Sequence, residues 1–385
     1  MTKARTVGHE AIKKIAAMFA IQGQMTASSE VESGLINSTF LVTFLTENGE
    51  EARYIMQRIN ESVFKNPYTV MANVERVTKH INQKVLRVKK DSAGQTLNIY
   101  PGRDGRSFVE GAGGGVWRCY NFIEGCRTYD VVENRRQAQQ AARAFGAFQH
   151  LVSDLPAEKI KETIPDFHHT RKRYEKLLLA IATDSAGRVS KVEREIAFIK
   201  KREAWLGRLI DLQELGELPV RVTHNDTKIN NVMIDEETDE AVCVIDLDTV
   251  MPGLALYDFG DLVRTATSPA AEDERDLSKV EMRMEMFEGL VEGYLESAAD
   301  FLTEMEIAHL VFAGKLISIE VAIRFLTDFL SGDIYFKTTR PSQNLDRCRT
   351  QLKLVESIED QEEAMEGFVR TVMQRMKPNF AVADR

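Results

Sequence analysis

Residues that could carry out phosphoryl transfer gather in one short segment, residues 222–253. The segment reads VTHNDTKINNVMIDEETDEAVCVIDLDTVMPG and places Asp226, Asn231, Asp246 and Asp248 beside apolar runs. Phosphoryl transfer needs a carboxylate that orients the attacking hydroxyl and accepts its proton. It also needs oxygen ligands for Mg²⁺, which bridges and neutralises phosphate oxygens. The residue types in this segment supply both.

The spacing within the segment is that of a kinase catalytic loop. His-x-Asp-x-x-x-x-Asn is followed fifteen residues later by Asp246. This pattern predicts Asp226 as the catalytic base and Asn231 and Asp246 as ligands of Mg²⁺. Lys228, two residues after the base, is placed to meet the transferred phosphate. We interpret His224 as a hydrogen-bonded scaffold residue.

Short buried strands must position these side chains. The runs at 220–224, 231–235 and 241–248 are apolar enough for strands, and the acidic residues 236–240 form the turn between the last two. Asp226 then lies on the loop that enters the hairpin, and the metal ligands lie at its strand ends.

A second acidic motif, YDFGDL at 257–262, spells the Asp-Phe-Gly of protein kinases. It lies 27 residues past Asn231 and follows no buried strand. We therefore expect Asp258 to cap or orient a helix that starts near Asp261, rather than to bind metal. The alternative is that Asp258 supports the catalytic site through a residue that it contacts.

The composition describes an ordinary soluble protein. The chain has 385 residues, 43% hydrophobic and 28% charged, and its net charge of −9 argues against a nucleic-acid partner. No run is apolar enough for a membrane span, because charges interrupt the best candidate at 309–330. None of the four cysteines forms a CxxC pair, so we expect reduced thiols and a cytoplasmic location.

The first ~120 residues predict a small lobe that is mostly antiparallel sheet. Ile12, Ile15, Ala16 and Phe19 follow a helical stripe. Asn48-Gly49 joins two strand-like runs within residues 34–60 and predicts a hairpin. The same reasoning predicts a helix at 67–83 and then strands at 84–90 and across 96–123.

From about residue 130 the pattern becomes helical, with 3.6-residue stripes in successive segments such as 194–215. The fold class is therefore α+β. It divides into an N-lobe at 1–120, a hinge at 121–126 and a mainly helical C-lobe at 127–385.

HNDTKINN and VIDLD resemble the aminoglycoside phosphotransferase and choline kinase superfamily, which comprises small-molecule kinases with a two-lobed, protein-kinase-like fold. The chain is similar, more closely, to the bacterial N-acetylhexosamine 1-kinases, through GLINSTFLV, YIMQRIN, WRCYNFIEG, IPDFHHTRKRY and IRFLTDFLSGDIYFK. The resemblance implies ATP and Mg²⁺ as cofactors.

The same resemblance implies roles for further residues. Arg324 and Tyr335 would meet the sugar whose hydroxyl Asp226 deprotonates. Asp248, the second acid of Asp-x-Asp, would reach the metal through water. In the hinge, the backbone of Asn121, Phe122 and Ile123 would bind adenine.

The sequence departs from kinases at the phosphate-binding positions. A third-strand lysine is missing, and YIMQRIN offers Gln57 or Arg58 instead. Strand alternation lets only one of them face the nucleotide, and the charge of Arg58 favours it. Its partner would be Glu75, although an exposed helical glutamate explains that residue too.

The phosphate loop also departs from the kinase pattern, because SGLINSTF is no GxGxxG loop. Gly34 permits a turn, and Asn37, Ser38 and Thr39 could donate to phosphate. An ordinary hairpin tip would carry the same residues.

Glu320, Arg324 and Asp328 are spaced i, i+4, i+8 on one expected helix. From this spacing alone we expect a ladder of salt bridges. Asp333 and Tyr335 follow Gly332 and should lie on a loop that lines a pocket.

The motif spacing predicts ATP-dependent phosphoryl transfer, and the resemblance implies that the acceptor is the anomeric hydroxyl of GlcNAc or GalNAc. One alternative is the same chemistry on choline, ethanolamine, an aminoglycoside or another sugar. Another is a non-catalytic module that binds nucleotide or sugar. The sequence predicts neither the preferred epimer nor the oligomeric state.

Overall fold

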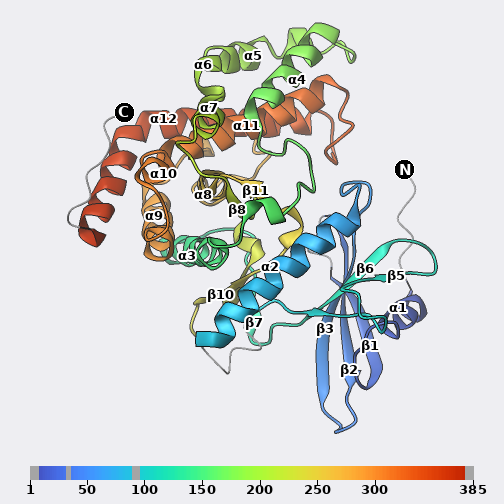
Figure 1. Ribbon diagram of the computed structural model, residues 1–385. Coiled ribbons are helices and arrows are strands. Elements are labelled where there is room, and N and C mark those ends of the chain that lie inside the picture. The colour runs from blue at the N-terminus through green and yellow to red at the C-terminus, as the bar shows by residue number, and fades with distance from the viewer. Residues whose placement is uncertain (1–7, 32–35, 89–95, 378–385) are drawn as a thin grey trace. The chain divides into compact units, whose positions relative to one another are not determined.

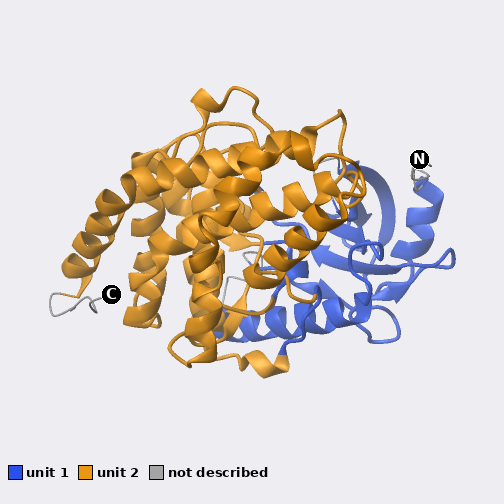
Figure 2. Ribbon diagram, turned by 90° about the horizontal axis from the view of Figure 1, so that it is seen from above, with its two compact units in different colours: residues 1–126, 160–164, 245–250 blue, residues 127–159, 165–244, 251–385 orange. Residues whose placement is uncertain are grey.

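The computed structural model describes residues 8–31, 36–88 and 96–377 (Figure 1), so Gly34 lies outside the described residues. The chain forms two compact units, coloured in Figure 2. Unit 1 comprises residues 1–126, 160–164 and 245–250, and unit 2 comprises residues 127–159, 165–244 and 251–385.

Unit 1 is built on an antiparallel sheet of strand order β1-β2-β3-β6-β4, in which β5 also pairs with β6. Strands β2 and β3 pair from Ser38↔Arg58 to Leu45↔Glu51, which confirms the predicted hairpin. The elements of unit 1 are α1 (His9–Ala16), β1 (Gln24–Val31), β2 (Ser38–Leu45), β3 (Glu51–Arg58), α2 (Pro67–Val88), β4 (Ile99–Tyr100), β5 (Val109–Glu110), β6 (Val116–Asn121) and the 3-10 turn η4 (Leu247–Thr249). The short strand β7 (Cys126–Arg127) marks the passage to unit 2.

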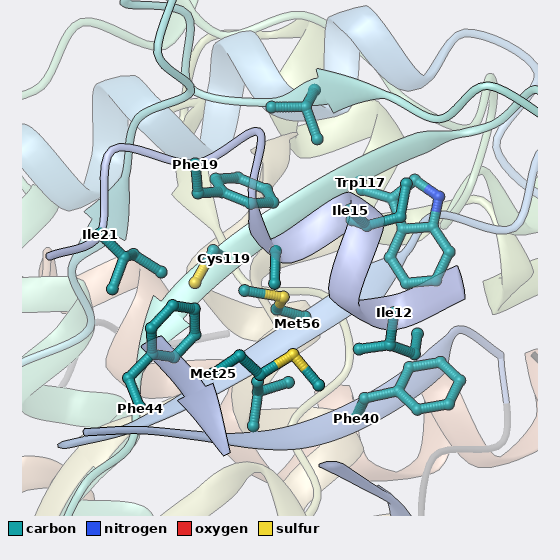
Figure 3. Packing of buried hydrophobic residues seen from close by; sticks show 13 residues of the cluster. Ile12, Ile15, Phe19, Ile21, Met25, Phe40, Phe44, Met56, Trp117 and Cys119 are labelled. Atoms are coloured by element: carbon teal, nitrogen blue, oxygen red, sulfur yellow. The ribbon is translucent and has the colours of Figure 1, made fainter. Parts of the chain in front are cut away.

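The core of unit 1 lies between α1 and one face of this sheet (Figure 3). The predicted helical stripe of Ile12, Ile15, Ala16 and Phe19 is buried there. Alternate sheet residues such as Phe40 meet it, because side chains on a strand alternate between its two faces.

The strand predicted at 84–90 is wrong for residues 84–88, which continue helix α2. Ile81 and Val85 are half-buried on one side of that helix, whereas Leu86 is 50% exposed. The β-branched residues in this run favour a strand prediction when the run is considered alone. Their spacing, however, continues the helical pattern of the preceding turns.

Unit 2 is mainly helical, as predicted. Its elements are α3 (Arg135–Val152), η1 (Ala157–Lys159), α4 (Thr170–Thr183), η2 (Val189–Lys191), α5 (Glu193–Lys200), α6 (Glu203–Leu206), α7 (Arg208–Glu214), β8 (Arg221–Thr223), η3 (Ile229–Asn231), β9 (Val232–Asp235), β10 (Ala241–Val244), β11 (Met251–Gly253), α8 (Ala255–Ala266), η5 (Leu277–Lys279), α9 (Met284–Ala298), α10 (Glu304–Ala308), α11 (Leu310–Leu330) and α12 (Gln343–Met376). The stripe at 194–215 is thus divided among three short helices.

Helices α3 and α9 approach each other closely in unit 2. Glycine at position 293 permits this approach, since a side chain there would collide with the Gln139 carbonyl oxygen. The strands predicted at 220–224 and 231–235 are present as β8 and β9. The strand predicted at 241–248 is present only as far as Val244, as β10, which pairs antiparallel with β9, and the 3-10 turn η4 follows it. In the described part of the chain, the helices are too short or too polar to cross a membrane.

Candidate active site

The two predicted catalytic residues, Asp226 and Lys228, lie on the loop between β8 and β9 together with the predicted metal ligand Asn231. Asp226 Oδ1 is 2.7 Å from Lys228 Nζ. The Asn231 side chain donates from Nδ2 to the Asp226 carbonyl oxygen at 2.9 Å and to Asp226 Oδ2 at 3.3 Å. The Asp226 side chain keeps 23% of its surface exposed. The loop therefore presents a carboxylate, an ammonium group and an amide side by side.

The neighbours of Asp226 keep it ionised. Burial acts to raise the pKa of Asp226, but the charge and hydrogen bond of Lys228, together with the charges of His224 and Arg264, hold this pKa below its ordinary value. For Lys228, burial acts to lower the pKa, but the charges of Asp226 and Asp261 raise it overall. An ionised carboxylate can accept a proton near neutral pH.

The backbone entering the loop is fixed by two carboxylates of α8. Asp258 accepts the His224 N–H at 2.9 Å and the Asn225 N–H at 2.7 Å. Asp261 accepts the Thr227 N–H at 3.0 Å. Asn225 has a φ of 65°, a left-handed conformation that needs such support. These hydrogen bonds fix the backbone on both sides of Asp226 and therefore determine the direction in which the side chain of this predicted base projects.

The expectation that a helix starts near Asp261 is wrong, because α8 begins at Ala255. Asp258 therefore lies within the first turn of the helix and is completely buried. Its carboxylate orients the catalytic loop rather than the helix.

His224 is a scaffold residue, as predicted. It is completely buried, with Phe145 and Phe148 at ring-centroid distances of 5.2 and 5.6 Å. Its Nδ1 accepts the Asp226 N–H at 3.3 Å. The imidazole therefore fixes the backbone of the predicted base through this hydrogen bond.

The predicted salt-bridge ladder on α11 is wrong, because its three residues turn to different partners. Glu320 contacts His168, with Oε1 at 2.9 Å from Nδ1. Asp328 accepts the backbone N–H groups of residues 334–336 at 2.8 to 3.0 Å. Arg324 stands between the rings of Phe167 and Phe336, at 5.1 and 5.7 Å from their centroids.

A second guanidinium lies near Arg324. Arg173 donates from Nη2 to the Phe167 carbonyl oxygen at 2.9 Å. Burial and then the charge of Arg324 lower the pKa of Arg173. Among the described residues, Arg324 makes no hydrogen bond and no salt bridge, although its charge helps to lower the pKa of the nearby Glu320 carboxyl. Its N–H groups are therefore available to a ligand.

A buried histidine links this cationic region to the catalytic loop. His168 adjoins Phe167 in sequence and lies 3.4 Å, through Nε2, from the carbonyl oxygen of Asn225. Its other nitrogen contacts Glu320, which also accepts a hydrogen bond from Thr170. Sequence reasoning missed His168, although the IPDFHHTRKRY segment contains it.

Tyr335, the other predicted sugar contact, lies on the loop that Asp328 anchors. Its side chain is 63% exposed. Asp333 on the same loop pairs with Arg188 at 2.6 Å and accepts from Asn344 at 2.9 Å. The loop is therefore held at its base while its tip faces solvent.

In unit 1, Gln57 and Arg58 point to opposite faces of the sheet. Gln57 Oε1 accepts from Arg118 Nε and Nη2 at 3.0 and 2.8 Å, and Gln57 Nε2 donates to Thr39 Oγ1 at 3.1 Å. The Arg58 guanidinium lies instead against Gly115, where a side chain would collide with it.

Arg118 is a polar residue that sequence reasoning missed. It is completely buried on β6 and forms an ion pair with Asp248. Burial acts to lower the pKa of Arg118, but the charges of Asp248, Tyr120 and Asp246 raise it overall. The sequence signal for Arg118 was a single arginine within the apolar run VWRCY.

Glu75, proposed as a partner for Arg58, pairs with Lys79 at 2.6 Å instead.

The predicted phosphate and hinge positions are engaged within unit 1. Asn37 donates to Asp248 Oδ2 at 2.7 Å and accepts the Asn60 N–H. The Asn121 N–H donates to the Asn98 carbonyl oxygen, and the Phe122 N–H donates to that of Arg53, both at 3.2 Å. Ile123 is buried directly after them.

The donor types at the predicted metal positions suit Mg²⁺. The Asn231 amide is oriented by its Nδ2 bonds to Asp226, which turns Oδ1 away from that residue. Asp246 supplies a carboxylate from a backbone with a φ of 59°. Amide and carboxylate oxygens are hard ligands, and Mg²⁺ needs only one or two of them beside phosphate and water. Among the described residues, no group of three or more His, Cys, Asp or Glu side chains could hold a metal ion.

A family model described as "Phosphotransferase enzyme family" matches residues 28–301. The chain belongs to this family. The match includes both the catalytic loop and the Asp-x-Asp segment, so phosphoryl transfer is the chemistry of the family to which these residues belong.

Solved structures share the fold at low sequence identity. An aminoglycoside phosphotransferase from Alicyclobacillus acidocaldarius is 12% identical with a TM-score of 0.58, covering 98% of each chain. An ethanolamine kinase from Plasmodium vivax is 14% identical with a TM-score of 0.51, covering 84% of this chain and 82% of that one. A GDP complex of aminoglycoside 2'-phosphotransferase-IIIa is 12% identical with a TM-score of 0.51, covering 89% and 97%. The α+β, protein-kinase-like fold predicted from the sequence is confirmed.

Proposed function

We propose that the protein is an ATP-dependent kinase that phosphorylates the anomeric hydroxyl of an N-acetylhexosamine, GlcNAc or GalNAc. The products are the sugar 1-phosphate and ADP. Family membership supports phosphoryl transfer. The choice of sugar rests on the sequence resemblance to N-acetylhexosamine 1-kinases and on the environment of Arg324.

In the proposed reaction, Asp226 orients the sugar hydroxyl and takes its proton. The sugar oxygen bonds to the γ-phosphorus while the bond from that phosphorus to the bridging oxygen of ADP breaks. Lys228 supplies positive charge beside the transferred group. Asn231 and Asp246 are the residues proposed to hold Mg²⁺, which when bound neutralises phosphate oxygens. Residues 1–120 would bind the nucleotide, with adenine at the 121–126 hinge, and residues 127–385 would bind the sugar.

The observation that carries the choice of acceptor is the guanidinium of Arg324, which makes no hydrogen bond and no salt bridge among the described residues. Arg173 lies near it, and the Phe167 and Phe336 rings flank it. Two guanidinium groups disfavour a cationic acceptor such as choline, ethanolamine or an aminoglycoside, and the single carboxylate of Glu320 offsets only part of their charge. A neutral amino sugar offers hydroxyl and acetamide oxygens that accept hydrogen bonds from arginine.

An acceptor panel tests this proposal. The protein, ATP and Mg²⁺ are mixed separately with GlcNAc, GalNAc, choline, ethanolamine and kanamycin, while ADP release and the phosphorylated product are followed. We expect sugar 1-phosphate from the N-acetylhexosamines alone. Turnover of choline or kanamycin would keep the kinase and overturn the sugar, whereas ATP binding without any turnover would favour a binding module.

Replacing Arg324 provides the matched test of the acceptor site. We expect Arg324→Met to lower kcat/KM for GlcNAc about 10- to 100-fold, the worth of a charged hydrogen bond, mainly through KM. Arg143→Met, which removes a 42%-exposed guanidinium from the same unit, should leave both constants unchanged. An unchanged KM in Arg324→Met would remove this residue from the acceptor site.

A further inference from the structure

The carboxylate of Asp248 is buried and held on both oxygens. Oδ1 accepts from the Arg118 guanidinium, and Oδ2 accepts from Asn37 Nδ2 at 2.7 Å. The side chains of Arg118 and Asp248 are 0% and 3% exposed. A buried carboxylate is stable only when it is paired and hydrogen-bonded, as this one is.

The guanidinium of Arg118 is itself fixed across neighbouring strands. Its Nε and Nη2 both donate to Gln57 Oε1, and Gln57 donates in turn to Thr39. Gln57 lies opposite Arg118 in the β3–β6 register and opposite Thr39 in the β2–β3 register. One row of side chains across β2, β3 and β6 therefore supports the cation that holds Asp248.

The backbone around Asp248 is fastened to unit 1 as well. Thr163 Oγ1 donates to the Asp248 carbonyl oxygen at 3.0 Å, and Asn73 Nδ2 donates to that of Val250 at 3.1 Å. Asp246, two residues before Asp248, has a left-handed backbone with a φ of 59°. A non-glycine residue holds that conformation at a cost of about 1–2 kcal/mol, so its surroundings must determine it.

We propose that Arg118 and Asp248 are a positioning pair that sets the carboxylate of Asp246 for the Mg²⁺–nucleotide complex. Arg118 supplies, from β6, the buried cation that the third strand lacks, and Gln57 fixes its direction. Asp248 is the partner of this cation and binds no metal. This inference rests on the proposed function, because it takes Asp246 as a metal ligand.

A double-mutant cycle read through nucleotide binding tests the pair. A fluorescent ADP analogue is titrated with and without Mg²⁺ against wild type, Arg118→Met, Asp248→Asn, the double variant of these two, and Asp246→Asn. The readout is the affinity for the ADP analogue with Mg²⁺ divided by the affinity without Mg²⁺. A general loss of structure lowers both affinities alike and leaves this ratio unchanged. We expect Arg118→Met to lower this ratio about tenfold, as for residues that orient metal ligands. The double variant should recover most of the loss, because no buried carboxylate is left unpaired.

Two further variants keep the test decisive if Arg118→Met does not unfold cooperatively. Gln57→Met keeps the charges of Arg118 and Asp248 and removes only the hydrogen bonds that Gln57 accepts from the Arg118 guanidinium. It should therefore lower the same ratio by a smaller factor. Arg106→Met removes a 49%-exposed arginine of unit 1 that pairs with Asp104 and Glu110, and it should leave the ratio unchanged.

The outcomes separate this inference from the proposed function. Wild-type protein that binds the ADP analogue equally with and without Mg²⁺ would overturn the proposed metal site and this inference together. A Mg²⁺-dependent wild type with an Asp248→Asn ratio as low as that of Asp246→Asn would make Asp248 a ligand and overturn the inference alone. A double variant no better than Arg118→Met would also overturn it.

Discussion

At the scale of single residues, the pair Asp226–Lys228 gives the proposed reaction its pH dependence. Lys228 holds the pKa of Asp226 below its ordinary value, so the base stays ionised as the pH falls. In Lys228→Met this pKa rises, and we expect the acid limb of kcat/KM for GlcNAc to move to higher pH. Measuring kcat/KM from about pH 4.5 to 8 reveals the limb.

The control for this prediction is Lys201→Met, which removes an exposed ammonium from the same unit and should leave the acid limb in place. An acid limb that does not move in Lys228→Met would mean that Asp226 is not the group whose ionisation limits the rate.

Residues of the candidate site were predictable from the sequence where their partners are close along the chain. Asp226, Lys228 and Asn231 lie within six positions, so the spacing itself encodes their contact. Arg118 and Asp248 are 130 positions apart, and His168 and Glu320 are 152 apart. Strand register and helix packing bring such pairs together, and the spacing of residue types along the sequence does not predict these tertiary contacts.

At the scale of elements, α8 determines the conformation of the catalytic loop. Both oxygens of Asp258 accept loop N–H groups, from His224 and Asn225. In Asp258→Asn one oxygen becomes an NH₂ group that faces an N–H donor. We expect a loss of about 1–3 kcal/mol in the free energy of unfolding, and a lower kcat because the base is displaced. Urea denaturation and steady-state kinetics measure the two effects.

Asp360→Asn, an exposed position on α12, is the control for Asp258→Asn and should change neither quantity. A variant at Asp258 with wild-type kcat would show that the loop holds its conformation without α8.

The elements themselves were predictable where a local signal marks their ends. Asn48-Gly49 marks the β2–β3 hairpin, and the structure has it there. The start of α8 carries no such mark, because its N-cap is Leu254, which offers no side-chain cap. The sequence pattern therefore predicts Asp258 as the cap of a later helix, whereas its carboxylate makes tertiary contacts that a sequence pattern does not contain.

At the scale of the whole molecule, the candidate ligands divide between the two units. The predicted nucleotide contacts Asn37, Gln57 and Ile123 lie in unit 1, and the predicted sugar contacts Arg324 and Tyr335 lie in unit 2. A ligand that binds only the native state suppresses opening of the segments that hold it. Each ligand added alone should therefore leave its own pattern of amide hydrogen exchange.

We expect ADP alone to slow exchange within 37–58 and 116–123, and GlcNAc alone to slow it within 224–231 and 324–336. A ligand at 100 times its Kd stabilises the native state by about 2.7 kcal/mol, which slows exchange about 100-fold where opening releases the ligand. Choline, which two guanidinium groups repel, should protect neither set. Protection of 37–58 by GlcNAc, or of 324–336 by ADP, would reassign the two ligands, because neither segment contains a residue proposed to contact that ligand.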